Sequence, residues 1–150
     1  MNGLGELYQQ LIIDHNRNPR NFGTLDGANR AASGDNPLCG DRVRVYLKVA
    51  NGVIEEARFE GNGCAISQAS ASLMTMAVRG KSPADALALF HAFHSMVTSP
   101  PTAAPDAGAL GKLAAFAGVR TFPARVKCAN LPWHTLRAAL EGDPGGVSTE

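Results

Sequence analysis

Residues 42–60 read RVRVYLKVANGVIEEARFE and predict a β-hairpin. In its first half, apolar side chains alternate with polar ones, as is typical of a strand with one buried face; the apolar positions are Val43, Val45, Leu47 and Val49. Asn51-Gly52 then predicts a type I′ turn, because both central residues of that turn need a positive φ. We expect the return strand from Val53 to Glu60, with Ile54 and Phe59 in the core.

Helices are expected on both sides of the hairpin, where apolar residues recur at helical spacing. Gly80 and Ser82-Pro83 mark the end of one helix and the start of the next. The predicted helices cover residues 4–18, 65–79, 83–97, about 110–117 and 128–141. The segment 24–40 is expected to form an irregular loop, with only a weak signal for a strand before Cys39, and 98–108 an exposed loop rich in proline.

These elements predict an α+β domain, in which helices pack on a small antiparallel sheet of about three strands. A chain of 150 residues fits one such domain. We expect the domain to cover residues 1–141 and residues 142–150 to form a flexible tail.

Charge and composition exclude several classes of protein. The formal net charge is +1, from 14 basic and 13 acidic side chains, which argues against a nucleic-acid-binding surface. The first residues lack a basic stretch followed by an apolar run, and no apolar segment approaches the roughly 18 residues of a membrane span. An odd number of cysteines, 3, argues against a secreted disulfide framework. The sequence therefore predicts a cytoplasmic protein with no membrane or nucleic-acid partner.

The three cysteines lie in three different local contexts. Cys39 lies in a turn that contains proline and glycine, and Asp41 follows two residues later, so both side chains can point the same way from an extended backbone. Cys64 follows Gly61-Asn62-Gly63, whose glycines permit a sharp turn and a close approach of the backbone. We expect Cys64 and Cys128 at helix starts, where unpaired amides and the helix dipole favour the thiolate.

If these four side chains converge, three thiolates and one carboxylate form a donor set that suits tetrahedral zinc. Arg125 and Lys127, just before Cys128, could then offset the remaining negative charge and orient Asp41 by a hydrogen bond. Spacing alone leaves open whether they meet. The chain has no CxxC pair, and a buried free cysteine often packs as a small hydrophobic side chain.

Motifs around the cysteines carry a family resemblance. They read NPLCGD at 36–41, GNGCAIS at 61–67 followed by ASAS at 69–72, and FPARVKC at 122–128. Together with Leu7-Tyr8, Asp14-His15 and PRNFG at 19–23, they resemble the iron–sulfur cluster assembly scaffold family, which includes IscU, the NifU N-terminal domain and SufU. The resemblance covers about residues 4–140. It implies that Cys39, Asp41, Cys64 and Cys128 hold zinc or a nascent cluster.

Two features resemble the SufU branch of that family. IscU-type members carry a histidine immediately before the third cysteine and a Leu-Pro-Pro-Val-Lys chaperone motif, whereas this chain has Lys127 and FPARVK. The extra stretch from about Phe93 to Ala109 also looks like the SufU-type insertion. The resemblance implies a zinc-dependent sulfurtransferase that accepts persulfide sulfur from a SufS-like cysteine desulfurase, with Cys39 as the catalytic acceptor. Downstream cluster assembly proteins would be its other partners, and handoff through an Hsp70-type chaperone is not expected.

Two alternatives stay open at this point. The same ligands suit a non-enzymatic scaffold on which transient iron or a [2Fe–2S] cluster is assembled. Zinc could also be purely structural in a domain that only docks other proteins.

The remaining polar residues carry weaker signals. His91 and His94 are spaced i, i+3 on a predicted helix, but they lack further ligand-type neighbours, so a surface or half-buried position is expected. His134, beside Trp133, is expected to be structural, and His15 has no assigned role. The basic side chains of the first strand predict a solvated face rather than a docking surface; they are Arg42, Arg44 and Lys48.

Overall fold

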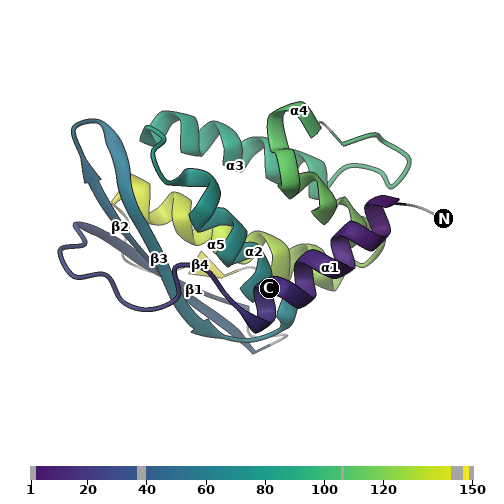
Figure 1. The fold of residues 1–150 in the computed structure, drawn as a ribbon, viewed down its shortest axis with the longest axis horizontal. Helices are drawn as coiled ribbons and strands as arrows, with labels where there is room; N and C mark the ends of the chain where they lie inside the picture. The colour runs from purple at the N-terminus through teal and green to yellow at the C-terminus, as the bar shows by residue number, and fades with distance from the viewer. Residues whose placement is uncertain (1–2, 37–39, 106, 143–146, 149–150) are drawn as a thin grey trace.

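The computed structural model describes residues 3–36, 40–105, 107–142 and 147–148. Its elements, in chain order, are α1 (Gly3–Arg17), β1 (Arg30–Asn36), β2 (Asp41–Ala50), β3 (Val53–Asn62), α2 (Ala65–Val78), α3 (Pro83–Val97), α4 (Ala107–Leu110), the 3₁₀ helix η1 (Gly111–Thr121), α5 (Pro123–Glu141) and β4 (Val147–Ser148). The sheet has the order β3-β2-β1-β4, and α2 and α5 pack on it (Figure 1). The helices α1, α3 and η1 pack in turn on α2 and α5. The predicted α+β fold is confirmed.

The β2–β3 hairpin forms as its sequence predicts. Val43, Val45 and Leu47 of β2 point inward and are almost fully buried, and Val49 is partly buried, while Asn51 and Gly52 adopt positive φ angles of 55° and 77°. A β-bulge after Lys48 shifts the register between the two strands. Because of this bulge, Ile54 and Phe59 both face the core although they are five positions apart, a spacing that places two residues on opposite faces of a regular strand.

Strand β1 confirms the weakly indicated strand before Cys39 and corrects the prediction that the rest of residues 24–40 forms an irregular loop throughout. Residues 30–36 read RAASGDN and pair antiparallel with β2, from Arg30 opposite Leu47 to Asn36 opposite Asp41. This segment has no β-branched or aromatic residue, so its own propensity does not favour a strand. It is held by pairing with β2 and by packing against α5, where Ala32 is 1% exposed. Its small side chains let α5 approach the sheet closely.

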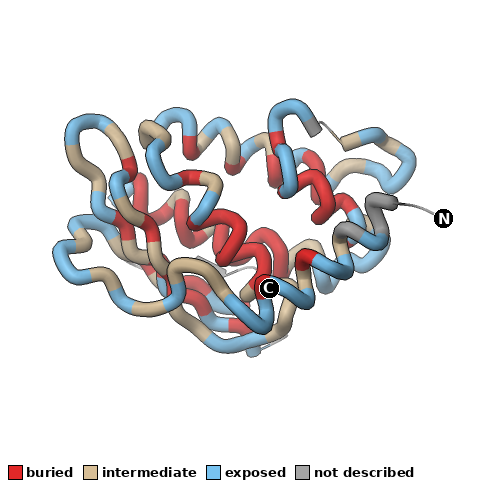
Figure 2. The backbone as a smooth tube through the Cα atoms, in the orientation of Figure 1, coloured by how far each residue is buried: buried red, intermediate tan, exposed pale blue. Residues whose placement is uncertain are grey.

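The core lies between the sheet and the helices, and buried residues concentrate along α2 and α5 (Figure 2). Its centre is aromatic: Phe93 of α3 stacks on Trp133 of α5, with ring centroids 4.8 Å apart, and also contacts Phe116 of η1. The predicted start of α3 is confirmed, because the Ser82 side chain accepts a hydrogen bond from the Asp85 N–H, 3.1 Å away.

The final helix begins earlier than the sequence predicts. The sequence predicts this helix over residues 128–141, whereas α5 starts at Pro123. Proline suits the first helical position, because the N–H that it lacks has no intrahelical partner there. The predicted short helix at 110–117 is also different: α4 gives way to the 3₁₀ helix η1, which continues to Thr121.

Helix α5 ends at Gly142, whose left-handed conformation, with a φ of 74°, suits glycine. Beyond it, Val147–Ser148 form the short strand β4, which runs parallel to β1. The domain boundary at residue 141 and the flexibility of residues 142–150 stay predictions. Within the described ranges, no helix combines the length and the apolar character needed to cross a membrane.

Candidate metal centre

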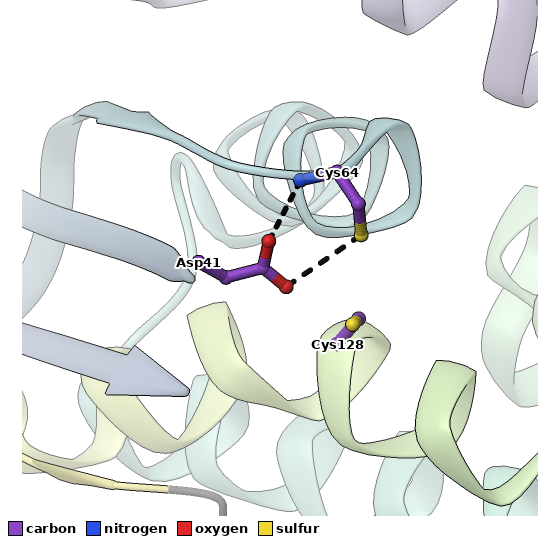
Figure 3. Close-up of side chains that lie close together, drawn as sticks. All are labelled: Asp41, Cys64 and Cys128. Carbon is purple, nitrogen blue, oxygen red and sulfur yellow. Dashed lines mark hydrogen bonds between the residues drawn. The ribbon is translucent and has the colours of Figure 1, made fainter. Parts of the chain in front are cut away.

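Three of the four predicted ligands meet at one point between the sheet and the helices. Asp41 lies at the start of β2, Cys64 directly before α2, and Cys128 within α5. Their ligand atoms all lie within 4.8 Å of one another, and Figure 3 shows the three side chains converging. The fourth predicted ligand, Cys39, lies outside the described residues.

The carboxylate of Asp41 is buried and held by Cys64. Inward-facing residues alternate along β2, and Asp41 belongs to the same face as Val43 and Val45. Its Oδ1 accepts a hydrogen bond from the Cys64 backbone N–H at 2.7 Å, and its Oδ2 accepts one from the Cys64 thiol at 3.5 Å. The sequence predicts a cation as the group that orients Asp41, and residue type alone does not indicate this backbone donor.

Two glycines allow β2 and the end of β3 to come this close. A Cβ at Gly63 would lie 2.9 Å from the Cα of Asp41, and a Cβ at Gly61 would lie 3.0 Å from the Cα of Val43. Both glycines also have φ angles, +155° and +159°, that side chains rarely adopt. The glycines around Asn62 therefore bring the backbone against Asp41, and so place Cys64 beside it.

Cys64 occupies the N-cap position of α2, as predicted. Its φ of −74° and ψ of 161° are extended, so its thiol lies at the open end of the helix. A hydrogen bond with Cys128 lowers the pKa of the Cys64 thiol to about 7, and the backbone N–H groups of Ser67 and Ile66 act in the same direction. Burial and the Asp41 charge oppose this shift. A substantial part of the Cys64 thiol is therefore ionised near neutral pH.

The prediction that Cys128 lies at a helix start is wrong, because α5 begins at Pro123, more than one turn before Cys128. Its side chain is 3% exposed. The adjacent backbone is tied to α2: Ser70 donates to the Ala129 carbonyl at 2.7 Å and accepts from the Trp133 indole N–H at 3.2 Å. These buried hydrogen bonds fix α5 against α2, and with it the position of Cys128 relative to Cys64.

The two predicted auxiliary cations lie in different surroundings. The Arg125 guanidinium lies over the Phe122 ring at 4.2 Å and lowers the pKa of Tyr8, while burial raises the pKa of that phenol more strongly. Tyr8 also responds to the charge of Cys64, so this part of α1 lies close to the centre. Lys127 instead lines a cavity on the side of α5 that contains His94 and His134. The proposed role of either cation in orienting Asp41 stays a prediction.

The donor set fits a thiophilic metal ion. In a tetrahedral zinc site with bonds of about 2.3 Å, two donor atoms lie about 3.8 Å apart. The observed separations, up to 4.8 Å, can be closed by small rotations of the side chains. Two thiols and one carboxylate suit zinc, and the thiols equally suit iron–sulfur chemistry.

The histidines lie away from this centre. His15 is 3% exposed, and its Nδ1 pairs with the Ser72 hydroxyl at 2.6 Å, an internal contact between α1 and α2. Within the described ranges, His91 and His94 join no group of three or more ligand-type side chains, so the i, i+3 pair gains no metal site. The His134 and His94 rings lie 5.5 Å apart, beside Phe90.

Comparison with known proteins gives consistent results. The model of the NifU-like N-terminal domain matches residues 7–129. The chain is 43% identical over 143 residues to the zinc-dependent sulfurtransferase SufU of Bacillus subtilis, covering 95% of each chain. It is 42% identical over 138 residues to the iron–sulfur cluster assembly scaffold protein IscU of Streptococcus pyogenes, covering 92% of this chain and 85% of that one. The crystal structure of an iron–sulfur cluster assembly scaffold protein for the SUF system (FiSufU), from Fervidobacterium islandicum AW-1, superimposes with a TM-score of 0.82 at 35% identity, covering 90% and 97% of the two chains.

Proposed function

The chain belongs to the NifU-like N-terminal domain family, and from that premise we propose that it is a zinc-dependent carrier that accepts persulfide sulfur for iron–sulfur cluster assembly. The donor would be a cysteine desulfurase, and the recipients would be downstream cluster assembly proteins. The observation that carries the proposal is the convergence of Asp41, Cys64 and Cys128, whose ligand atoms lie within 4.8 Å of one another. The similarity to a relative that is named a zinc-dependent sulfurtransferase supports the choice of zinc.

We assign the metal to Cys39, Asp41, Cys64 and Cys128. Cys39 is two residues from Asp41, and two residues of chain span at most about 7 Å, so its thiol is within reach of the other three donors. When bound, zinc would keep the thiols deprotonated and neutralise part of their charge.

Cys39 is the proposed sulfur acceptor. Its thiolate attacks the outer sulfur of the desulfurase persulfide, a new S–S bond forms on Cys39, and the bond within the donor persulfide breaks. The desulfurase cysteine leaves as a thiolate, so the exchange is redox-neutral overall. Asp41 is held by the Cys64 N–H, and Cys128 by the attachment of α5 to α2, so both stay in place while Cys39 exchanges its partner.

A second candidate function is a scaffold on which a [2Fe–2S] cluster is assembled and released. The donor set favours it as much as it favours zinc, and the IscU relative at 42% identity is named a scaffold. Anaerobic reconstitution of the purified protein with iron and sulfide distinguishes the two functions. A stable visible chromophore supports the scaffold, whereas zinc retained at one ion per chain without colour supports the sulfur carrier.

Sulfur uptake tests the carrier directly. The zinc-loaded protein is incubated with a desulfurase charged with ³⁵S-persulfide, and the label on this chain is measured after separation without reductant. We expect Cys39→Ser to abolish labelling while its circular dichroism spectrum stays that of the parent. His91→Gln, an exposed change away from the centre, serves as the control and should label normally. Full labelling of Cys39→Ser would contradict the assignment.

A further inference from the structure

A cavity of about 670 Å³ lies beside α5, between this helix, the end of α3 and the end of η1. It belongs to a different part of the surface from the candidate metal centre, since none of the three described ligands lines it. Its volume falls within the range of small-molecule sites. Besides the hydroxyl residues Thr98 and Ser99, its polar lining comes from His94, Arg120, Lys127, Asn130, His134 and Arg137.

The charge of this lining is entirely positive. Three cations and no carboxylate face the cavity. The Arg120 guanidinium already donates hydrogen bonds within the protein. Its acceptors are the Ser99 hydroxyl and the backbone carbonyls of Pro100, Pro101, Ala103 and Ala117. Lys127 has no ion-pair partner among the residues that the structure describes. Arg137 pairs with Glu141 at 3.0 Å, so within the described residues the positive charges of Lys127 and Arg120 are the ones left without a carboxylate partner.

Two buried polar atoms of the lining have no hydrogen-bond partner among the residues that the structure describes. They are Nδ1 of His94 and Oδ1 of Asn130, and Asn130 is only 5% exposed. Buried polar groups are normally paired, so such a pair of atoms at one cavity indicates a missing partner. Rotation of the Asn130 carboxamide would present its NH₂ group as a donor instead.

The chemistry excludes a metal cation as that partner. Burial, followed by the charges of His94 and Arg137, lowers the pKa of His134 to about 4, so its ring is neutral and could bind a metal. A cation in the cavity would, however, face Lys127, Arg137 and Arg120, and among the described residues only Arg137 has a carboxylate partner, Glu141, which does not line the cavity. An anion gains from the same three charges and can accept hydrogen bonds from the lysine and the imidazole.

We propose that this cavity binds a small phosphate-bearing molecule, with its phosphate group on Lys127 and His94. A dianionic phosphate matches several positive charges better than a single carboxylate does. The apolar side chains of Val97 and Val126 line the same cavity and offer contact to an organic body attached to the phosphate.

Binding of phosphate to the cavity can be followed through the ring signals of the four histidines of the chain. The ring proton signals of the full-length, metal-loaded protein are followed by NMR during titration with inorganic phosphate or with phenyl phosphate, against sodium chloride at equal ionic strength. We expect the His94 and His134 signals to shift with saturation, and those of His15 and His91 to stay in place. Tighter binding of phenyl phosphate identifies a phosphorylated organic ligand, and equal binding identifies free phosphate.

Matched variants decide whether the cavity is the site. Lys127→Gln should weaken phosphate binding at least 10-fold, and Arg137→Gln provides a second variant should the first alter the fold. Lys112→Gln removes the same charge from an exposed position in another part of the surface and should bind as the parent does. Shifts that rise linearly without saturation, shifts absent from His94 and His134, or equal losses in the Lys127 and Lys112 variants would each overturn the proposal.

Discussion

Replacement of Gly63 by alanine tests the geometry on which the candidate metal centre depends. The new Cβ would lie 2.9 Å from both the Cα and the Cγ of Asp41, closer than real Cβ contacts. Because one of these atoms is backbone, a change of side-chain rotamer cannot relieve the overlap. Either the start of β2 or the turn into α2 must move, and the hydrogen bond between Asp41 and the Cys64 N–H lengthens as a result.

The loss of unfolding free energy expected in Gly63→Ala has two parts. Alanine at the Gly63 φ of +155° costs about 1–3 kcal/mol in backbone conformation. Crowding against Asp41 adds about 1–3 kcal/mol, the usual cost of overpacking a well-packed position. We therefore expect Gly63→Ala to lower the free energy of unfolding by about 2–6 kcal/mol and, because Asp41 is displaced, to weaken zinc affinity at least 10-fold.

Gly23→Ala separates these two parts. Gly23 also has a positive φ, +128°, but a Cβ there would meet nothing within 4 Å. Gly23→Ala should lower the free energy of unfolding by the backbone cost alone and leave the zinc affinity unchanged. Urea unfolding gives the stability of both variants, and competition with a chromophoric chelator gives their zinc affinity. If Gly63→Ala binds zinc as tightly as Gly23→Ala does, the close approach of Gly63 does not position Asp41 and the reasoning is wrong.

Three further predictions follow from single side chains. Ser70→Ala leaves the buried Trp133 indole N–H unpaired and removes one hydrogen bond to the Ala129 carbonyl, so urea unfolding should show a loss of about 1–3 kcal/mol, and a loss below 0.5 kcal/mol would contradict the role of this serine. The pKa of His134 is lowered to about 4 in the folded state, so its contribution to stability is complete above the unfolded value of about 6.5 and is lost as the pH falls toward 4. After allowance for the partial exposure of the ring, this loss is about 1–2 kcal/mol, and chemical unfolding of His134→Gln across this range should show a flatter pH profile. In metal-free protein with Cys39→Ser, alkylation of Cys64 followed by mass spectrometry should have its midpoint near pH 7, and Cys128→Ala should raise it because the hydrogen bond from Cys128, which alanine cannot make, is the main cause of the low pKa.

The sequence predicted those elements whose signals are local. The hairpin follows from alternation in β2 and from Asn51-Gly52, and the start of α3 from Ser82, because each signal acts within a few residues. Strand β1 could not be predicted with confidence, since its pairing with β2 and its packing against α5 are what stabilise it. The start of the final helix was predicted at residue 128 rather than at Pro123 for a related reason, since proline breaks a helix interior but suits the first position of a helix.

In the candidate site too, the sequence indicates what depends on local signals and not what depends on long-range contacts. Cys39, Asp41, Cys64 and Cys128 could be nominated from residue type, but their spacing left their convergence open, and only the motif resemblance joined them. The contacts that place the described ligands are long-range. Asp41 is held by a backbone N–H that lies 23 residues away in sequence. Every residue type except proline has such a donor, so the only local sign of this contact is the adjoining Gly63.

The cavity beside α5 was the least predictable feature. His94, Lys127 and His134 each appeared in the sequence as isolated signals, and the histidines were expected to be structural or half-buried. The structure brings them together because α3 packs on α5. No periodicity or spacing within either helix indicates that a cavity forms between them.

The position of α5 links the two sites. Lys127 and Cys128 are adjacent in sequence, but successive helical residues point about 100° apart, so one faces the cavity and the other the candidate metal centre. The hydrogen bonds of Ser70 hold this helix against α2, and Asp41 is held by Cys64, in contacts that involve no metal ion. The described donors are therefore arranged by the protein itself, on top of a core centred on Trp133 and the sheet. In such a centre one thiol can exchange its partner while the remaining donors keep their places, which is the property that a sulfur carrier requires.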